Sequence, residues 1–176
     1  MGGGGGVIAP SDALSPSEWT EGPRSPKDSP YCDDQVEDLP PAMNRSDLHQ
    51  LTEARVRESQ ALLAAGEAAG AYYVAGYAVE CALKACIAKQ TQQYDFPEKR
   101  LVNASHTHNL SELLGLAGLR PALDGADAGV RANWAIAKDW SEQSRYELRT
   151  LTEAQDLFDA LSDPSDGVLT WLRRHW

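Results

Sequence analysis

Residues 71–88, AYYVAGYAVECALKACIA, are apolar almost all the way round a helix, yet they include one acidic and one basic residue. Glu80 and Lys84 are four residues apart, so both side chains project from one face of that helix. Tyr73, Tyr77 and Ile87 fall on the same stripe at helical spacing. Because charged side chains are almost never buried without a partner, the stripe must face a groove, a second chain or a paired polar site. We expect this face to carry the function.

Helical apolar spacing continues through residues 44–176, and glycine and proline fall between the periodic segments, apart from Gly76. Ser46 is the expected N-cap of a first helix that ends at Gly66 and Gly70. A loop is expected over 91–108, and further helices at about 71–90, 109–117, 127–140, after Thr150 and after Pro164. No segment alternates as a strand does, so we predict an all-α fold, an antiparallel up-and-down bundle of four to five helices.

Several apolar residues are expected to pack in the core rather than to bind a ligand. Alanines at positions 75, 78, 82 and 85 allow close approach of neighbouring helices, which predicts a central position for the 71–90 helix. Trp134 and Trp140 are expected to be core anchors, and Cys81 and Cys86 to pack as small apolar residues. Trp171 is expected to dock a final amphipathic helix onto the bundle.

The chain divides by composition into residues 1–43 and residues 44–176. The first part is rich in Gly, Pro, Ser and Asp and has few large apolar residues, which predicts a disordered tail. The net charge is −10, of which residues 1–40 contribute −6 (two basic, eight acidic) and residues 41–176 contribute −4 (14 basic, 18 acidic). A non-specific polyanion binder has a basic excess, so any contact with nucleic acid must involve few charges or two joined chains.

The three cysteines, Cys32, Cys81 and Cys86, have neither a disulfide-framework nor a zinc-ligand spacing, which favours a reducing compartment. The N-terminus has no basic n-region, and no uncharged apolar run is long enough to span a bilayer. We therefore expect a cytoplasmic protein that has no membrane contact, no metal and no cofactor.

Four segments in order resemble the HEPN domain: GYAVECALKACIA (76–88), DFPEK (95–99), HTHNLSELL (106–114) and SRYE (144–147), with a Trp-rich helix before the last. The resemblance covers roughly residues 48–176. It implies an α-helical bundle that often forms a homodimer. Many family members are ribonucleases of toxin–antitoxin, CRISPR and other defence systems, and others are RNA-binding or partner-binding modules without nuclease residues. Some are encoded beside a small nucleotidyltransferase that serves as antitoxin.

The nuclease members carry Arg-x(4–6)-His, usually with a polar residue after the arginine. Histidine moves protons near neutral pH, and arginine stabilises the charge that develops on phosphorus. The match in this chain is Arg100 with His106, but Leu101 follows the arginine and the pair precedes the expected position. The resemblance also makes Arg145, followed by Tyr146, the best candidate for an arginine in a cleft.

His108 matches the histidine of the family's His-Asp-Leu segment, which is His-Asn-Leu here. His106 and His108 could also be metal ligands, but no third ligand accompanies them. Glu80 and Lys84 could be an ordinary solvated pair, which contributes about 0.2–0.5 kcal/mol. They could instead line a dimer cleft, where Lys84 would contact a phosphate.

Three hypotheses follow, in order of preference. The first is an RNA-associated module of a toxin–antitoxin or defence-type pair, acting through a cleft lined by Glu80, Lys84 and Arg145. The second is a non-catalytic dimerising adaptor that binds a partner protein, such as the product of a neighbouring gene, through Tyr73 and Tyr77. The third is a metal-independent endoribonuclease that uses His106 or His108 with Arg100 or Arg145.

Overall fold

The computed structural model describes residues 1–2, 43–91 and 98–176. The predicted tail over residues 1–43 therefore lies outside the described residues, apart from its first two residues and Met43, and Cys32 lies outside them too. Across the described ranges all regular secondary structure is helical and no strand occurs, which confirms the predicted all-α class. The expected helices correspond to α1, α2, α4, α6, α7 and α8, and the further short helices α3, α5 and η4 lie between them.

Helix α1 (Arg45–Ala64) has its N-cap two residues before the predicted cap, Ser46. Asn44 is the N-cap, and its side chain accepts hydrogen bonds from the backbone N–H groups of Ser46 and Asp47. The Asp47 carboxylate accepts from the Asn44 N–H at 3.0 Å and completes a capping box. At the other end Gly66 has φ of 80°, and the Glu67 N–H bonds back to the Leu62 carbonyl, which is a Schellman ending.

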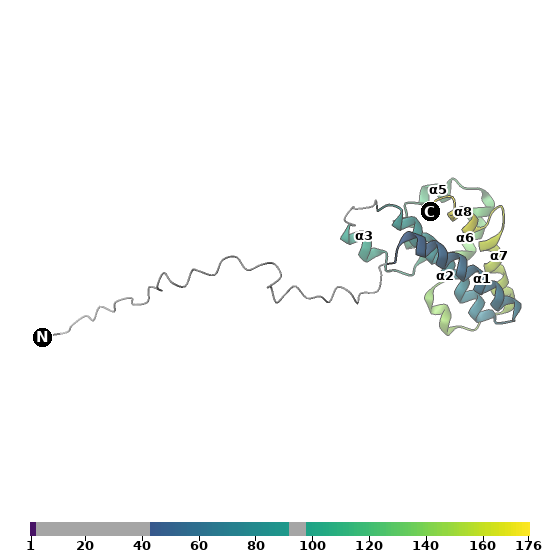
Figure 1. Ribbon diagram of the computed structural model, residues 1–176, viewed down its shortest axis with the longest axis horizontal. Helices are drawn as coiled ribbons and strands as arrows, with labels where there is room; N and C mark the ends of the chain where they lie inside the picture. Colours follow the sequence, from purple (N-terminus) through teal and green to yellow (C-terminus); the bar gives the residue numbers. More distant parts are fainter. Residues whose placement is uncertain (3–42, 92–97) are drawn as a thin grey trace, which may run out of the picture. The chain divides into compact units, whose positions relative to one another are not determined.

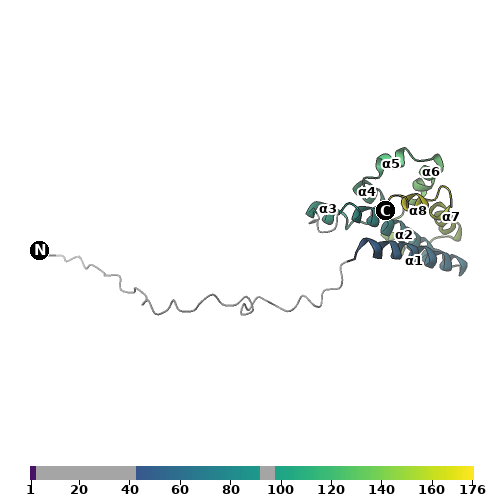
Figure 2. The same ribbon diagram turned by 45° about the horizontal axis from the view of Figure 1, so that its top comes forward.

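Helix α2 (Ala68–Ala88) is the central helix, as predicted, and it includes Gly70, which was expected to mark the end of α1. Twelve of its 21 residues are buried, and it contacts α1, α4, α7, α8 and η4. Figures 1 and 2 both show α1 running alongside α2. The alanines at 75, 78, 82 and 85 are all buried, which allows this close packing. Ser59 of α1 donates a hydrogen bond to the Ala71 carbonyl at 2.9 Å across the contact.

Gly76 is the one glycine that the periodic pattern places in mid-helix. The position of Trp140 explains why no larger residue stands there. The Trp140 side chain is 2% exposed and lies directly on α2 at Gly76, where an added Cβ would overlap the indole ring. The predicted core role of Trp140 is thus confirmed, as is that of Trp134, which is also buried. The contact fixes the chain segment after α6 against the middle of α2.

Three short helices follow α2. Helix α3 (Lys99–Ala104) occupies part of the predicted loop and has no buried residue, which explains why its apolar pattern gave no signal. Helix α4 (Leu110–Leu116) has the predicted start, where Asn109 caps the N–H groups of Ser111 and Glu112. Helix α5 (Arg120–Asp124) contains Pro121 in its first turn. A proline is tolerated there, because the N–H groups of a helix's first turn have no partner within the helix.

The last elements are α6 (Ala128–Ala137), the 3-10 helix η4 (Glu142–Tyr146), α7 (Leu151–Ser162) and α8 (Val168–Leu172). Thr150 caps α7 as predicted, in a capping box with Glu153. Trp171 of α8 is buried, as predicted. Beyond α8 the chain returns to α1: Arg173 forms two hydrogen bonds with the Glu53 carboxylate, at 2.8 and 3.0 Å.

Candidate functional site

The Glu80 carboxylate is the centre of the polar stripe on α2. It is 3% exposed, and each of its oxygens has a partner. Oε1 accepts from the Lys84 Nζ at 2.8 Å, one helical turn along α2. Oε2 lies 2.9 Å from His108 Nδ1, which comes from the residue before the α4 cap. A buried carboxylate is stable only when paired and hydrogen-bonded, and here two partners from two parts of the chain satisfy it.

The two partners of Glu80 remain accessible. The Lys84 side chain is 25% exposed and the His108 side chain 40% exposed. When His108 Nδ1 carries a hydrogen, it donates to Glu80 and leaves Nε2 free to accept a proton or a hydrogen bond. The carboxylate therefore orients two groups that can meet an anion or transfer a proton at the surface.

An aromatic wall lies beside this cluster. The Tyr77 ring is edge-on to His108, with centroids 6.3 Å apart, and edge-on to Trp140 at 5.5 Å. Tyr73 packs edge-on against Tyr77 at 5.1 Å and also contacts Trp140. Both tyrosines are half-buried and pack against the core. The tyrosine stripe thus supports the polar cluster from one side.

The ionisation of Tyr77 reflects this environment. Burial, a hydrogen bond with Tyr73 and the negative charge of Glu80 raise the pKa of Tyr77 to about 12, although the nearby charge of Arg145 opposes the shift. Tyr77 therefore stays a neutral phenol across the physiological pH range. It can donate or accept a hydrogen bond at the cluster, but it cannot act there as an anion.

Arg145 approaches the cluster from η4. Its guanidinium lies 5.0 Å from the centroid of the Tyr146 ring, and its side chain is exposed. The pKa of Glu142 is lowered by a hydrogen bond to its own backbone and by one from Gln143. The charges of His108 and Arg145 lower it further. Both charges therefore act on Glu142, and the charge of Arg145 also acts on Tyr77.

The structure separates the other two predicted residues from this cluster. His106 lies on the opposite side of Lys84, where both side chains line a cavity, and no described residue forms a hydrogen bond with its ring. Arg100 is exposed on α3 and is not part of the cavity lining or of the Glu80 cluster. The Arg100–His106 motif therefore does not meet Glu80, whereas Lys84 and His108 both contact its carboxylate. Arg145 contacts the Tyr146 ring, and its charge acts on Tyr77.

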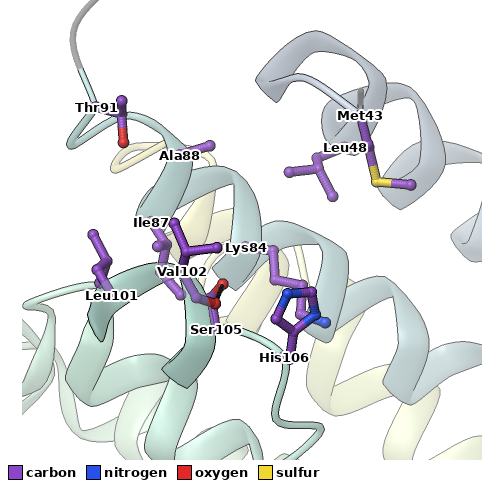
Figure 3. A pocket seen from close by; sticks show the side chains of 10 residues that line it. All are labelled: Met43, Leu48, Lys84, Ile87, Ala88, Thr91, Leu101, Val102, Ser105 and His106. Atoms are coloured by element: carbon purple, nitrogen blue, oxygen red, sulfur yellow. Dashed lines mark hydrogen bonds between the residues drawn. The ribbon is translucent and has the colours of Figure 1, made fainter. Parts of the chain in front are cut away.

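The cavity beside His106 has a volume of about 520 Å³ and lies between α1, α2 and α3. Figure 3 shows Lys84 and His106 at one end of it. Its other walls are mainly apolar and include Met43, Leu48, Ile87, Leu101 and Val102. Sequence analysis missed this cavity, because two of its apolar lining residues, Leu101 and Val102, lie on α3, in the segment expected to be a loop.

The described residues contain no group of three or more His, Cys, Asp or Glu side chains placed to hold a metal ion. The predicted His-x-His pair is separated, because His108 bonds to Glu80 while His106 faces the cavity. In the described part of the chain, no helix is both long and apolar enough to cross a bilayer.

Sequence reasoning identified Glu80, Lys84, Tyr73, Tyr77, His108 and Arg145, but it did not pair Glu80 with His108. These two residues are 28 positions apart, and helical spacing carries no information across such a separation. Glu142 was missed entirely; a carboxylate three residues before Arg145 is the signal that could have identified it. Comparison with protein-family models, with curated proteins and with solved structures gives no match to this chain.

Proposed function

We propose that this chain is an RNA-associated module of the HEPN type, in which Lys84, His108 and Arg145 contact RNA phosphates. One observation carries the proposal: a buried carboxylate, Glu80, holds Lys84 and His108 in fixed positions while leaving both side chains accessible. The order of the four sequence segments that resemble HEPN domains supports the same assignment.

Fixed cations suit phosphate recognition for an energetic reason. Lysine and arginine lose rotamer entropy when they bind a phosphate, and an orienting partner reduces that loss. Glu80 provides this partner for Lys84 through the 2.8 Å contact, and Tyr146 restricts Arg145 by stacking.

The charge balance limits the interaction to a few phosphates. Residues 41–176 have a net charge of −4 (14 basic minus 18 acidic), so no diffuse basic face drives binding. The two cations Lys84 and Arg145 give a weak and salt-sensitive complex. For single-stranded RNA the slope of log K against log salt should be about −1.4, at roughly −0.7 for each phosphate neutralised.

The test is fluorescence anisotropy of the full chain with a labelled single-stranded RNA, titrated over a series of salt concentrations. Lys84→Ala should weaken binding and reduce the slope by about 0.7, because one phosphate contact is lost. Arg57→Ala is the matched control, since Arg57 is exposed on α1 away from Glu80. Equal losses in both variants, or no binding by the wild type at low salt, would refute the proposal.

A second candidate, a metal-independent endoribonuclease, is favoured by the His108–Glu80 hydrogen bond. A carboxylate on Nδ1 fixes the tautomer that leaves Nε2 as a base, and this is the arrangement that general-base histidines use. Arg145 and Lys84 would then stabilise the phosphorane charge. This geometry selects His108 rather than His106 as the base.

Cleavage of a labelled hairpin RNA in the presence of EDTA tests the second candidate. His108→Ala should abolish turnover and Glu80→Gln should reduce it by roughly 10–10⁴-fold, because the base loses its orientation. His106→Ala should retain wild-type turnover. Activity that survives His108→Ala would remove this assignment, while RNA binding without cleavage would leave the first proposal standing.

The proposed partners follow from the same resemblance. We expect a homodimer, in which two clusters could face one RNA, and a nucleotidyltransferase-type antitoxin or another neighbouring gene product as the second component. The alternative adaptor role through Tyr73 and Tyr77 has weaker support, because both side chains pack against Trp140 rather than standing free. Light scattering across a concentration series tests the dimer.

A further inference from the structure

The cavity between α1, α2 and α3 shares Lys84 with the Glu80 cluster, but the rest of its lining differs from the cluster in chemistry. Its volume of about 520 Å³ falls in the range of about 300–1,000 Å³ that is typical of small-molecule sites. Leu48 and Ile87, 7% and 6% exposed, form its floor, and both belong to the well-packed helices α1 and α2. Part of the site is therefore preformed.

The remaining walls expose apolar surface that the fold does not cover with described residues. Val102 is 39% exposed and Met43 is 63% exposed, and both line this cavity. Leu101 of α3 lies beside them. Large apolar side chains gathered in a concave site, rather than scattered singly, are typical of a binding surface. A ligand that fills this site gains free energy mainly by covering aliphatic carbon.

One end of the cavity is different, because it presents Lys84 and His106 (Figure 3). Lys84 has three ammonium donors and uses one of them on Glu80. The Ser105 hydroxyl donates its hydrogen to the Val102 carbonyl at 2.7 Å, so it cannot donate to a ligand. Lys84 and His106 are thus the donors at this end, and both suit an anionic group.

We propose that this cavity binds a small amphipathic monoanion, an aliphatic carboxylate whose chain lies along Leu48, Ile87 and Val102 and whose carboxylate meets Lys84 and His106. The aliphatic walls match the alkyl chain of such a molecule, and the cation at one end matches its carboxylate. A nucleobase fits less well, since none of the described residues lining the cavity is Phe, Tyr or Trp to stack on it. The inference goes beyond the proposed RNA function and does not depend on it.

Octanoate and octanol are the probes, because they share the same alkyl chain and differ in charge. Calorimetric titration of the full chain should show saturable octanoate binding about tenfold tighter than octanol binding, as expected for a hydrogen bond to a charged group. Lys84→Met should remove that difference by weakening octanoate alone. Equal affinity for the two probes in the wild type, or no saturable binding of octanoate, would overturn the proposal.

A second variant keeps the inference distinct from RNA binding. Val102→Asp places a negative charge in the aliphatic wall at a half-exposed position and should weaken octanoate binding by at least about tenfold. Leu148→Asp is the matched control, because Leu148 is 97% exposed and does not line the cavity. Both variants should bind RNA as the wild type does. Octanoate binding that is unchanged in Val102→Asp, or lost equally in both, would refute the assigned site.

Discussion

At the scale of single residues, a glycine and a tryptophan make a close contact in the middle of α2. Glycine in a helix interior costs about 1 kcal/mol relative to alanine, so Gly76 weakens α2 locally. The compensation is the Trp140 ring, which lies on the helix backbone at that position and is 2% exposed. This contact also holds the segment leading to η4, and therefore Arg145, near Tyr77.

Gly76→Ala should lower the free energy of unfolding by about 1–3 kcal/mol, because the new methyl group would overlap the indole and force Trp140 to move. Urea unfolding followed by tryptophan fluorescence measures the change. Gly70→Ala in the same helix is the control. Its Cβ would lie 3.4 Å from the Leu62 side chain, so it should be neutral or stabilising by up to about 1 kcal/mol. A stabilised Gly76→Ala protein would show that this contact is looser than described.

The candidate site could be predicted from sequence only in part, because sequence patterns reveal contacts between near neighbours in the chain but not between distant residues. Glu80 and Lys84 were paired correctly because a helix places residues i and i+4 on one face. The bond from Glu80 to His108 depends on how α4 packs on α2, and no local pattern encodes that packing. Arg100 and His106 match a sequence motif, but in the fold Arg100 is exposed on α3 and does not line the cavity that His106 lines.

At the scale of elements, side-chain caps define the starts of α1, α4 and α7. Thr150 and Glu153 form a reciprocal box at α7: the Thr150 N–H donates to the Glu153 carboxylate at 2.8 Å, and the Glu153 N–H donates to the Thr150 hydroxyl at 3.2 Å. Hydrogen bonds from the Thr150 backbone and hydroxyl lower the pKa of Glu153 below its usual 4.5. At the end of α7, N–H groups of Asp166 and Ser165 lower the pKa of Asp163 in the same way.

These shifts predict a specific loss of stability in acid. A carboxyl whose pKa is lower in the folded state stabilises the fold above its unfolded pKa, and this contribution disappears as the pH falls through the folded value. The urea midpoint should therefore fall between about pH 6 and about pH 3. Glu153→Gln should show a smaller fall, since its amide oxygen can still accept the Thr150 N–H without titrating.

Asp156→Asn is the control for this comparison, because it removes a carboxylate from the interior of the same helix without touching the cap. Its urea midpoint should show the wild-type dependence on pH. If Glu153→Gln and the wild type lose the same stability in acid, the capping carboxylate is not the group responsible.

Helix prediction succeeded where one face of a helix is largely buried, with or without a side-chain cap, as α2 shows, and failed at α3, where no residue is buried. Helix α7 has both a cap and a buried face, with Thr150 at its start and Leu157 buried on its inner face, and its position was predicted. Helix α3 has neither a side-chain cap nor a buried residue, so its sequence is indistinguishable from a loop. Helix α1 has two cap-forming residues near its start, Asn44 and Ser46, and composition alone could not choose between them.

At the scale of the whole described domain, the chain's last residues lie on its first helix. The Trp176 ring stacks on His49 of α1 with centroids 4.3 Å apart, and the Lys89 ammonium at the end of α2 donates to the His175 carbonyl at 2.9 Å. Burial, together with the charge of Arg45, lowers the pKa of His49, although Glu53 opposes this shift. The C-terminal residues therefore contact the first helix, and the pKa of His49 indicates whether this contact is intact.

Trp176→Ala should raise the pKa of His49 toward its usual 6.5, because removing the indole readmits water to the imidazolium. Titration of the histidine ring protons by NMR measures the change. Trp176→Phe retains an aromatic ring over His49 and should keep the lowered pKa. A His49 titration that is the same in Trp176→Ala and the wild type would mean that Trp176 does not shield it.

The central position of α2 has a consequence for how the protein opens. Five other elements contact this helix, so its middle can lose hydrogen bonds only when the bundle itself comes apart. In native-state hydrogen exchange, the amides of Val79 and Leu83 should therefore exchange at the rate of global unfolding and respond fully to denaturant. The amides of α3, which has no buried residue, should exchange through local opening and show little dependence on denaturant. The cavity wall on α3 would thus open locally, while α2, which forms part of the cavity floor, would open only when the whole bundle unfolds.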